Sequence, residues 1–372
     1  MAGSVLLIVT TFANAFWAGW LLALRPRQLT GTQDRYDGLH TTTAVFAVPF
    51  MLVAGLLADK WGVEIVLLLG GCLAALAFVG LDRGNSLVPT IGAAALLAGA
   101  IAALLVGSLV LMPHAFYPAH PARSMNLGFI AIALGGLGGG LFVSQLTTTW
   151  GHHKTTLALA MASLLPAACV VSTPAGDFGD ATGGDITLLL SDVRIVLILV
   201  IAALCFPLDA ALGPWVRRYV REHAYRPSSA TLMAVGYWVA FLGTRLIVGL
   251  MLPTGWEHVW IVVWAILAVV ILTNMLGAYS PGTNLAGLWL TGACCAPLVP
   301  TLLGLALRNY AESAGLVLGL TAAAGMLGNL LVLPWIDATR PECLTRTSLR
   351  GATALAVVLL VPALVLAVIG IL

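Results

Sequence analysis

The stretch "GLLADKWGVE", residues 55–64, decides how the rest of the sequence is interpreted. It places an acid and a base, Asp59 and Lys60, side by side between two long apolar runs. Only 9% of the 372 residues are charged and 60% are hydrophobic, whereas a soluble domain carries about a quarter charged residues. The composition therefore predicts a polytopic membrane protein in which this stretch connects two spans.

Apolar windows long enough to cross a membrane recur along the whole chain. A bilayer core about 30 Å thick needs roughly 20 apolar residues in a helix. We predict twelve spans, at residues 4–24, 39–58, 64–81, 88–112, 126–147, 155–173, 192–213, 229–252, 258–278, 285–307, 314–335 and 350–372. No segment alternates polar and apolar residues as a barrel strand would, so we expect an all-α integral membrane protein.

One connection differs from the others. The stretch "STPAGDFGDATGGDITLLLSD", residues 172–192, is rich in Gly, Ser and Thr and holds four aspartates but no base. This composition is typical of a flexible linker. We therefore predict an N-terminal six-helix half at 1–173, a central loop at 174–191 and a C-terminal six-helix half at 192–372. Two six-helix halves around a central site are a known transporter plan.

The opening stretch resembles a loop of a known family. Gly55, Ala58, Asp59 and Gly62 resemble the G-x-L-a-D-r-x-G-r-[KR] loop of the major facilitator superfamily, which joins the second and third helices in that family. The resemblance implies a transporter fold of twelve helices in two halves. It also implies a gating role for this loop, including Lys60, with the glycines forming tight turns and Asp59 pairing across the halves.

The chain departs from the family pattern after the second glycine. Val63 and Glu64 replace the usual basic pair, which implies a gate held by fewer charge contacts. We therefore predict that Asp59→Asn impairs transport less here than the family pattern suggests.

Four other stretches resemble the fucose:proton symporter-type branch of the superfamily, whose members carry sugars. They are residues 122–142, 213–223, 241–252 and 296–309. In that branch the proton-coupling carboxylates lie in the first and fourth helices, and the corresponding spans here contain no Asp or Glu. A coupled proton must therefore use another residue.

Two ionisable residues lie inside the predicted spans, away from the helix ends. Such a residue costs at least about 2.5–3.5 kcal/mol to insert, so it usually has a function. Asp209, in the seventh span, is the candidate for binding a proton or a substrate hydroxyl; the alternative is a structural acid paired with a neighbouring helix. Arg245, in the eighth span, is near enough to its helix end to reach the headgroups. The resemblance groups Arg245 with the gating loop.

Uncharged polar and aromatic groups supply the other candidate substrate contacts. Asn14 and Trp17 lie on one face of the first span, and Tyr237 and Asn329 lie in the eighth and eleventh spans. Indole faces stack on sugar rings, but membrane tryptophans more often anchor helices at the interface, the role we expect for Trp20. Polar side chains also join membrane helices to one another, so both interpretations stay open.

Proline and glycine predict irregular or close-packed helices at three places. The stretch "CAPLVP", residues 295–300, puts Pro297 and Pro300 in the middle of the tenth span. Each proline removes a helix hydrogen bond, so we predict a broken or kinked helix that works as a hinge. The glycines of "GGLGGG" (135–140) and "GMLGN" (325–329) predict close approach of helix backbones.

Several classes of function find no support in the sequence. It contains no catalytic constellation, no phosphate-binding glycine loop and no metal-ligand spacing, and the cysteines fit the role of small buried hydrophobes. No basic cluster indicates nucleic-acid binding. We therefore expect neither an enzyme nor a cofactor or metal. The expected partners are a small-molecule substrate, membrane lipid and, as a candidate coupling ion, the proton, with the chain a monomer.

The distribution of basic residues conflicts with the orientation of the family. Loops after odd-numbered spans carry 12 Lys and Arg residues, and the other loops carry 4. The positive-inside rule would place the N-terminus outside, whereas the resemblance implies that both termini are cytoplasmic, and we follow the resemblance. The basic outer face that results could attract an anion or contact lipid phosphates.

These features together predict a secondary active transporter in the cell membrane. It would move a small polar, sugar-like solute by alternating access, with Asp209 as the candidate for proton coupling. An organic or inorganic anion carrier that uses the basic outer face is the alternative. A non-transporting membrane protein with the same fold is a third possibility.

Overall fold

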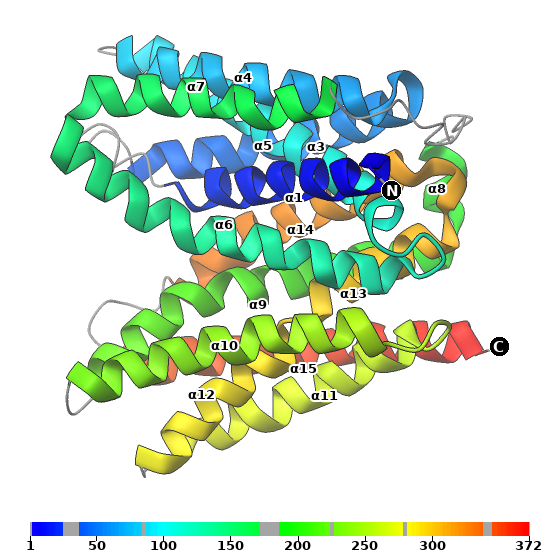
Figure 1. Ribbon diagram of the computed structural model, residues 1–372. Coiled ribbons are helices and arrows are strands. Elements are labelled where there is room, and N and C mark those ends of the chain that lie inside the picture. The colour runs from blue at the N-terminus through cyan, green and yellow to red at the C-terminus, as the bar shows by residue number, and fades with distance from the viewer. Residues whose placement is uncertain are drawn as a thin grey trace. The chain divides into compact units, whose positions relative to one another are not determined.

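The computed structural model describes residues 2–24, 37–83, 87–171, 186–223, 227–277, 281–337 and 344–371. Within these ranges every regular element is a helix (Figure 1). Most of the predicted central loop, residues 174–185, lies outside them. So do five arginines of the predicted basic face, Arg25, Arg27, Arg35, Arg226 and Arg340.

In the described residues one helix corresponds to each of eleven predicted spans, and two helices share the tenth. The first six are α1 (Ala2–Ala23), α3 (Asp37–Trp61), α4 (Val63–Arg83), α5 (Leu87–Ala115), α6 (Pro121–Trp150) and α7 (His152–Val171). After the short α8 (Ile186–Ser191) come α9 (Val193–His223), α10 (Pro227–Met251), α11 (Glu257–Leu276), α12 (Pro281–Cys295), α13 (Leu298–Asn309), the 3-10 turn η1 (Ala311–Ser313), α14 (Ala314–Asp337) and α15 (Leu344–Ile371).

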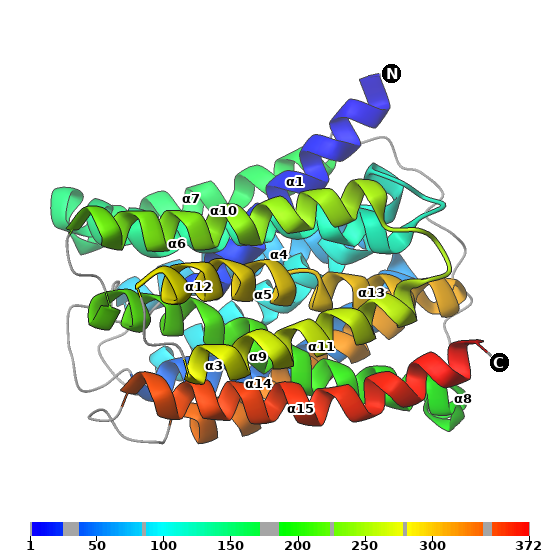
Figure 2. The same ribbon diagram turned by 90° about the horizontal axis from the view of Figure 1, so that it is seen from below.

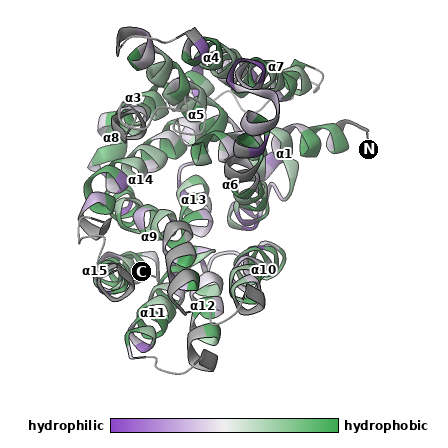
Figure 3. Cartoon of the chain, turned by 90° about the vertical axis from the view of Figure 1, so that its left-hand side faces the viewer, coloured by the Kyte–Doolittle hydropathy of each residue, from purple (hydrophilic) through white to green (hydrophobic). Residues whose placement is uncertain are grey.

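The helices have the length and polarity of membrane spans. Eleven helical stretches of the described chain are long and apolar enough to cross a membrane; α6, at the predicted span 126–147, is not among them. Hydrophobic residues, in green, recur along the helices of the cartoon in Figure 3, and large side chains such as Leu165 and Val171 are 67% and 72% exposed. Such exposure of apolar side chains suits a lipid environment, and the predicted all-α membrane fold is confirmed.

The described helices pack into two compact units. Unit 1 comprises Met1–Ile186 with Asn309–Ala323, and unit 2 comprises Thr187–Arg308 with Ala324–Leu372. Helix α14 therefore gives its first residues to unit 1 and the remainder to unit 2. In unit 1, α5 is central and packs against α1, α3, α4 and α6. In unit 2, α12 packs against α9, α10 and α11.

The stretch 55–64 folds as the end of one helix, a single linking residue and the start of the next. That residue is Gly62, whose φ of +92° lies in the left-handed region that favours glycine. The predicted tight turn is confirmed at Gly62 and wrong at Gly55, which lies inside α3. A Cβ on Gly55 would overlap the carbonyl oxygen of Gly315, so glycine is needed there because α14 approaches α3 closely.

The predicted close approach of helix backbones is confirmed at both glycine-rich stretches. In unit 1 a Cβ on Gly135 of α6 would overlap the carbonyl oxygen of Phe16 on α1. In unit 2 a Cβ on Gly328 of α14 would overlap the carbonyl oxygen of Ala203 on α9. Glycine therefore lets each pair of helices meet backbone to backbone, which strengthens their van der Waals packing in a membrane.

We expect Gly135→Ala to lower the thermal stability of the detergent-solubilised protein, because a methyl group there meets backbone atoms that no rotamer change can move. Overpacking of this kind costs about 1–3 kcal/mol. The adjacent Gly136→Ala is the control, since its Cβ would have only the carbonyl oxygen of Gly19 nearby, at 3.7 Å. Equal unfolding temperatures for the two variants would contradict the interpretation.

Candidate functional site

Asp209 on α9 and Arg245 on α10 form an ion pair inside unit 2. Oδ1 of Asp209 lies 3.6 Å from Nη2 of Arg245, and the two side chains are 27% and 2% exposed. This separation is too long for a hydrogen bond, and within the described chain Oδ1 accepts none. The carboxylate is therefore charge-compensated yet still able to accept a proton or a hydroxyl group.

The expectation that Arg245 reaches the headgroups is wrong, because its guanidinium is held inside the unit. Nε donates a hydrogen bond of 3.0 Å to the carbonyl oxygen of Ala296, and the guanidinium carbon lies 4.2 Å from the ring centroid of Phe241. Phe241 in turn stacks on Tyr237, with ring centroids 5.8 Å apart. These three side chains recur every four residues on one face of α10, and their contacts offset the cost of burying the cation.

The predicted break in the tenth span is confirmed, because α12 and α13 are separate helices (Figure 2). Pro297 and Pro300 have no N–H, so the carbonyl four residues before each has no helical donor. For Pro300 that carbonyl belongs to Ala296, the group that Arg245 binds. The arginine thus satisfies a buried backbone acceptor that the proline leaves open. Whether the break works as a hinge stays a prediction.

The far end of α13 is held by a second ion pair in unit 2. Glu257, at the start of α11 and 2% exposed, pairs with Nη1 of Arg308 in the last turn of α13. Its Oε2 also accepts a hydrogen bond of 2.9 Å from the backbone N–H of Gly255. The half-helix α13 is therefore fixed at its end by Glu257, while its beginning adjoins the carbonyl held by Arg245.

We expect Glu257→Gln to lower thermal stability, because the amide loses the charge that Arg308 pairs with and keeps only one acceptor. Hydrogen bonds to charged groups contribute about 1.5–3 kcal/mol. Glu312→Gln is a matched control, since Glu312 is an exposed acid on the short η1 turn. Unfolding followed by tryptophan fluorescence in detergent measures both, and a larger loss for Glu312→Gln would rule out this role.

In unit 1 the acid of the opening stretch caps α14. Oδ1 of Asp59 accepts a hydrogen bond of 2.6 Å from the N–H of Gly315, and Oδ2 accepts one of 2.8 Å from the N–H of Leu316. The first amides of a helix have no intrahelical partners and carry partial positive charge, so a carboxylate stabilises them. Lys60, beside it, is exposed.

The arrangement of these helices matches solved transporters. The chain is similar to a crystal structure of the Major Facilitator Superfamily transporter FucP in the outward conformation, with a TM-score of 0.77, 16% identity and 98% of each chain covered. It is also similar to the human organic anion transporter MFSD10, with a TM-score of 0.72, 16% identity and 98% of each chain covered. For the proton:xylose symporter XylE bound to 6-bromo-6-deoxy-D-glucose, the TM-score is 0.71 at 13% identity, with 97% of this chain and 95% of that one covered.

The chain has the major facilitator fold. No protein-family model matches the sequence, and a comparison with curated proteins finds no match. The fold that the opening loop and four other stretches predicted by resemblance is confirmed, and FucP is among the structures that share it.

Within the major facilitator fold, Asn14 joins two helices of unit 1. It is fully buried, and its Nδ2 donates hydrogen bonds to the carbonyl oxygens of Thr10, at 2.9 Å, and of Pro166 on α7, at 3.3 Å. This is the helix-joining use of asparagine in membranes. Only Oδ1 has no hydrogen bond within the described chain, so a substrate role for Asn14 depends on that atom and stays a prediction.

The two tryptophans of α1 are stacked on each other, with ring centroids 4.6 Å apart. Trp17 is 9% and Trp20 5% exposed. The interfacial anchoring expected for Trp20 is therefore wrong: its indole lies against α6, where a Cβ on Gly139 would approach it to 3.1 Å. Nε1 of Trp17 is buried with no hydrogen bond in the described structure, and its substrate role stays a prediction.

Unit 2 holds further buried polar atoms without hydrogen bonds in the described structure, among them Oδ1 of Asn329 and Nε1 of Trp289. No sequence pattern singled out Trp289, because an indole inside an apolar run first indicates hydrophobicity. A Cβ on Gly236 would overlap its ring, so the indole lies directly on the α10 backbone beside Tyr237. The structure thus brings Tyr237 together with Asp209, Arg245 and Trp289, all within unit 2.

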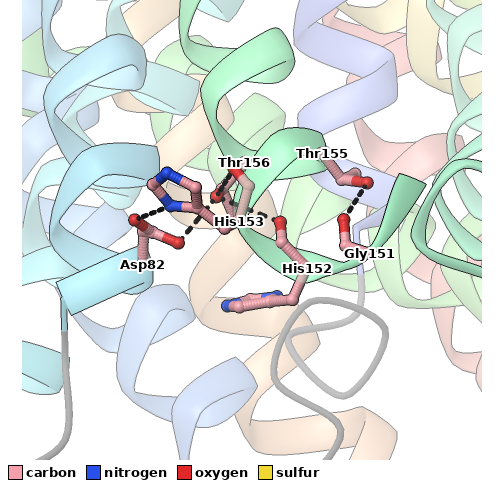
Figure 4. Close-up of polar contacts among 6 residues, drawn as sticks. All are labelled: Asp82, Gly151, His152, His153, Thr155 and Thr156. Carbon is pink, nitrogen blue, oxygen red and sulfur yellow. Dashed lines mark hydrogen bonds and ion pairs between the residues drawn. The ribbon is translucent and has the colours of Figure 1, made fainter.

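A polar cluster in unit 1 joins α4 to α7 (Figure 4). Nδ1 of His153 lies 2.7 Å from Oδ2 of Asp82, and Oγ1 of Thr156 donates a hydrogen bond of 3.1 Å to Oδ1 of the same carboxylate. The histidine side chain is 77% exposed. This contact has no local signal in the sequence, because Asp82 lies 71 positions from His153.

Proposed function

We propose that the chain is a secondary active transporter that moves a small polar, sugar-like solute by alternating access, with Asp209 as the proton-coupling group. The observation that carries the proposal is the ion pair of the half-buried Asp209 with the buried Arg245, beside the break in the tenth span. Charged groups inside membrane spans mark proton and substrate pathways, and discontinuous helices are where transporters bind substrates and move. The spans that correspond to the first and fourth helices contain no carboxylate.

Several predicted contacts support a hydroxyl-rich substrate. In unit 2, Asp209 and Asn329 each have a buried oxygen that accepts no hydrogen bond within the described chain; in unit 1, taken by itself, Asn14 has such an oxygen and Trp17 such a donor. Sugars offer hydroxyl groups to these atoms and apolar faces to aromatic rings such as Tyr237. The similar structures include a fucose:proton symporter and a proton:xylose symporter.

Uptake into proteoliposomes with and without an inward proton gradient tests transport and coupling together. A thermal-shift screen of monosaccharides first selects the substrate, because a ligand that binds the native state raises the unfolding temperature. We expect a sugar that stabilises the protein to accumulate faster when the outside is acidic. An uptake rate that is the same with and without the proton gradient would overturn proton coupling. If no stabilising ligand is taken up at all, the result would favour a non-transporting protein.

We propose that both termini face the cytoplasm, as the family orientation implies. Cysteines introduced singly at Gln33 and Asp180 of an otherwise cysteine-free protein report the sidedness of their loops. A membrane-impermeant maleimide added outside should label only the first variant. Labelling of only the second would reverse the orientation and agree with the count of basic residues.

An anion carrier is the second candidate, and the buried guanidinium of Arg245 favours it. Arginine is the side chain best suited to bind carboxylates or phosphates, and one similar structure is titled an organic anion transporter. The basic residues Arg217, Arg218 and Arg221 would then attract the substrate to the outer face. If neutralising these three arginines leaves the affinity for every transported solute unchanged, they do not attract the substrate, and this part of the anion proposal is wrong.

A further inference from the structure

Arg245 is placed to connect the proton-coupling group of unit 2 with the break in its tenth span. One guanidinium contacts both features, with Nη2 facing Oδ1 of Asp209 at 3.6 Å and Nε bonded to the carbonyl oxygen of Ala296 at 3.0 Å. The Ala296 carbonyl has no helical donor because residue 300 is a proline. A change in charge on one side of the guanidinium therefore acts directly on the backbone at the break.

The surroundings of Asp209 leave Arg245 as its only cationic neighbour in the described structure. The ionisable groups on which the charge of Asp209 acts are Cys205 on α9, Tyr237 and Arg245 on α10, and Cys295 at the end of α12. Helix α15 also packs on α9, and Arg350, the one ionisable side chain of α15 that the structure describes, is exposed.

We propose that Arg245 is the coupling residue of this protein: it transmits the protonation state of Asp209 to the break between α12 and α13. The inference rests on the proposed proton-coupled transport. With Asp209 ionised, the guanidinium is held between α9 and the Ala296 carbonyl, which restrains the break. With Asp209 protonated, the buried cation loses its counter-charge, an expensive state, and the guanidinium moves away from α9 together with the backbone it binds.

The geometry explains why an arginine is needed. Two separate N–H groups of one rigid fork must point at a carboxylate on α9 and a carbonyl in the break between α12 and α13. A lysine would keep the positive charge near Asp209 but has a single nitrogen and cannot take both positions. Arg245→Lys should therefore keep the positive charge beside Asp209 but lose the link between Asp209 and the Ala296 carbonyl.

The break contains its own reporters, the buried thiols of Cys294 and Cys295, which are 5% and 1% exposed. We consider a protein in which the other cysteines, Cys72, Cys169, Cys205 and Cys343, are replaced by alanine. Modification by N-ethylmaleimide in proteoliposomes is measured at about pH 8 and about pH 5.5, and each rate is divided by that of the same protein unfolded at the same pH, which removes the titration of the thiol itself.

We expect the corrected rate for the wild-type break to rise about tenfold on acidification, since release of a charge-assisted contact changes a local opening equilibrium by that order. Asp209→Asn should label at the fast rate at both pH values. Arg245→Lys should label at a rate that does not depend on pH.

Pro300→Ala provides a second test that keeps the ion pair intact. The new backbone N–H can bond to the Ala296 carbonyl as in a regular helix, so it competes with Arg245 and should remove the pH dependence of labelling. Pro362→Ala, which replaces a proline inside α15, is the control and should label like the wild type.

The results distinguish the inference from the function on which it rests. If Asp209→Asn transports with the wild-type pH dependence, the proposed proton site is wrong. If Asp209→Asn loses that dependence while Arg245→Lys and Pro300→Ala still label in the wild-type, pH-dependent way, proton coupling stands and transmission through Arg245 is overturned.

Discussion

Asp209→Asn will abolish the response of uptake to a proton gradient and will also destabilise the protein. The amide cannot be ionised, so uptake should no longer accelerate as the outside pH falls. The same change leaves the guanidinium of Arg245, which is 2% exposed, without a counter-charge. Removing one partner of a buried ion pair costs about 3–5 kcal/mol, and the arginine cannot relieve this cost by losing its proton.

The double variant Asp209→Leu with Arg245→Leu separates the two effects. Replacing a buried pair by apolar side chains is often neutral, so the double variant should recover most of the stability that Asp209→Asn loses, apart from the hydrogen bond to Ala296. It should still show no proton-driven uptake. Unfolding in detergent and uptake into proteoliposomes measure the two properties. Proton-driven uptake by the double variant would show that proton coupling does not need the Asp209–Arg245 pair.

The fold could be predicted because its determinants are local. The number of spans follows from apolar windows whose length the bilayer fixes. The break in the tenth span follows from Pro297 and Pro300, which cannot donate backbone hydrogen bonds wherever they lie. The backbone approaches at Gly135 and Gly328 follow from the absence of a Cβ. None of these inferences requires knowledge of which helix is the neighbour.

The candidate site could be predicted only in part, because its contacts join distant residues. Position along the eighth span suggested that Arg245 reaches the headgroups, whereas the ion pair with Asp209 and the Ala296 carbonyl hold it inside unit 2. Its neighbours Phe241 and Tyr237 could have been selected from their four-residue spacing, which places them on one helix face. The partner across the bundle had no signal in the sequence.

The same limit explains the error at Trp20. A tryptophan near the end of an apolar run has the sequence pattern of an interfacial anchor. Its burial against α6 depends on Gly139, more than a hundred residues away in the chain, which leaves room for the indole. For Asn14 the sequence left two roles open, substrate contact and joining of helices. The structure shows the contacts that join helices.

Gly55→Ala is expected to reduce uptake more than any change to the charges of the opening stretch. The new methyl group would overlap the carbonyl oxygen of Gly315 and would lie 3.2 Å from the Cα of Gly319. Both are backbone atoms, so α14 must move away from α3. This movement also breaks the two hydrogen bonds that Asp59 accepts from the start of α14.

Asp59→Asn should have a smaller effect than Gly55→Ala, in agreement with the prediction from Glu64. The amide oxygen can still accept one of the two hydrogen bonds, and the helices keep their close contact. Losing one charge-assisted hydrogen bond, about 1.5–3 kcal/mol, should weaken the contact without abolishing uptake. Lys60→Met, which removes the neighbouring exposed charge, is the matched control and should transport at the wild-type rate.

The order of the three variants tests what the contact does. Within unit 1 the first turn of α14 is held by Asp59 and lies against Gly55 of α3. If alternating access requires this turn to bind and release α3, uptake should fall in the order Lys60→Met, Asp59→Asn, Gly55→Ala, with surface expression unchanged. Complete loss of uptake in Asp59→Asn would show that the charge, rather than the backbone packing, controls the gate. Wild-type uptake in Gly55→Ala would show that transport does not depend on this contact, because no rearrangement of side chains can make room for the methyl group.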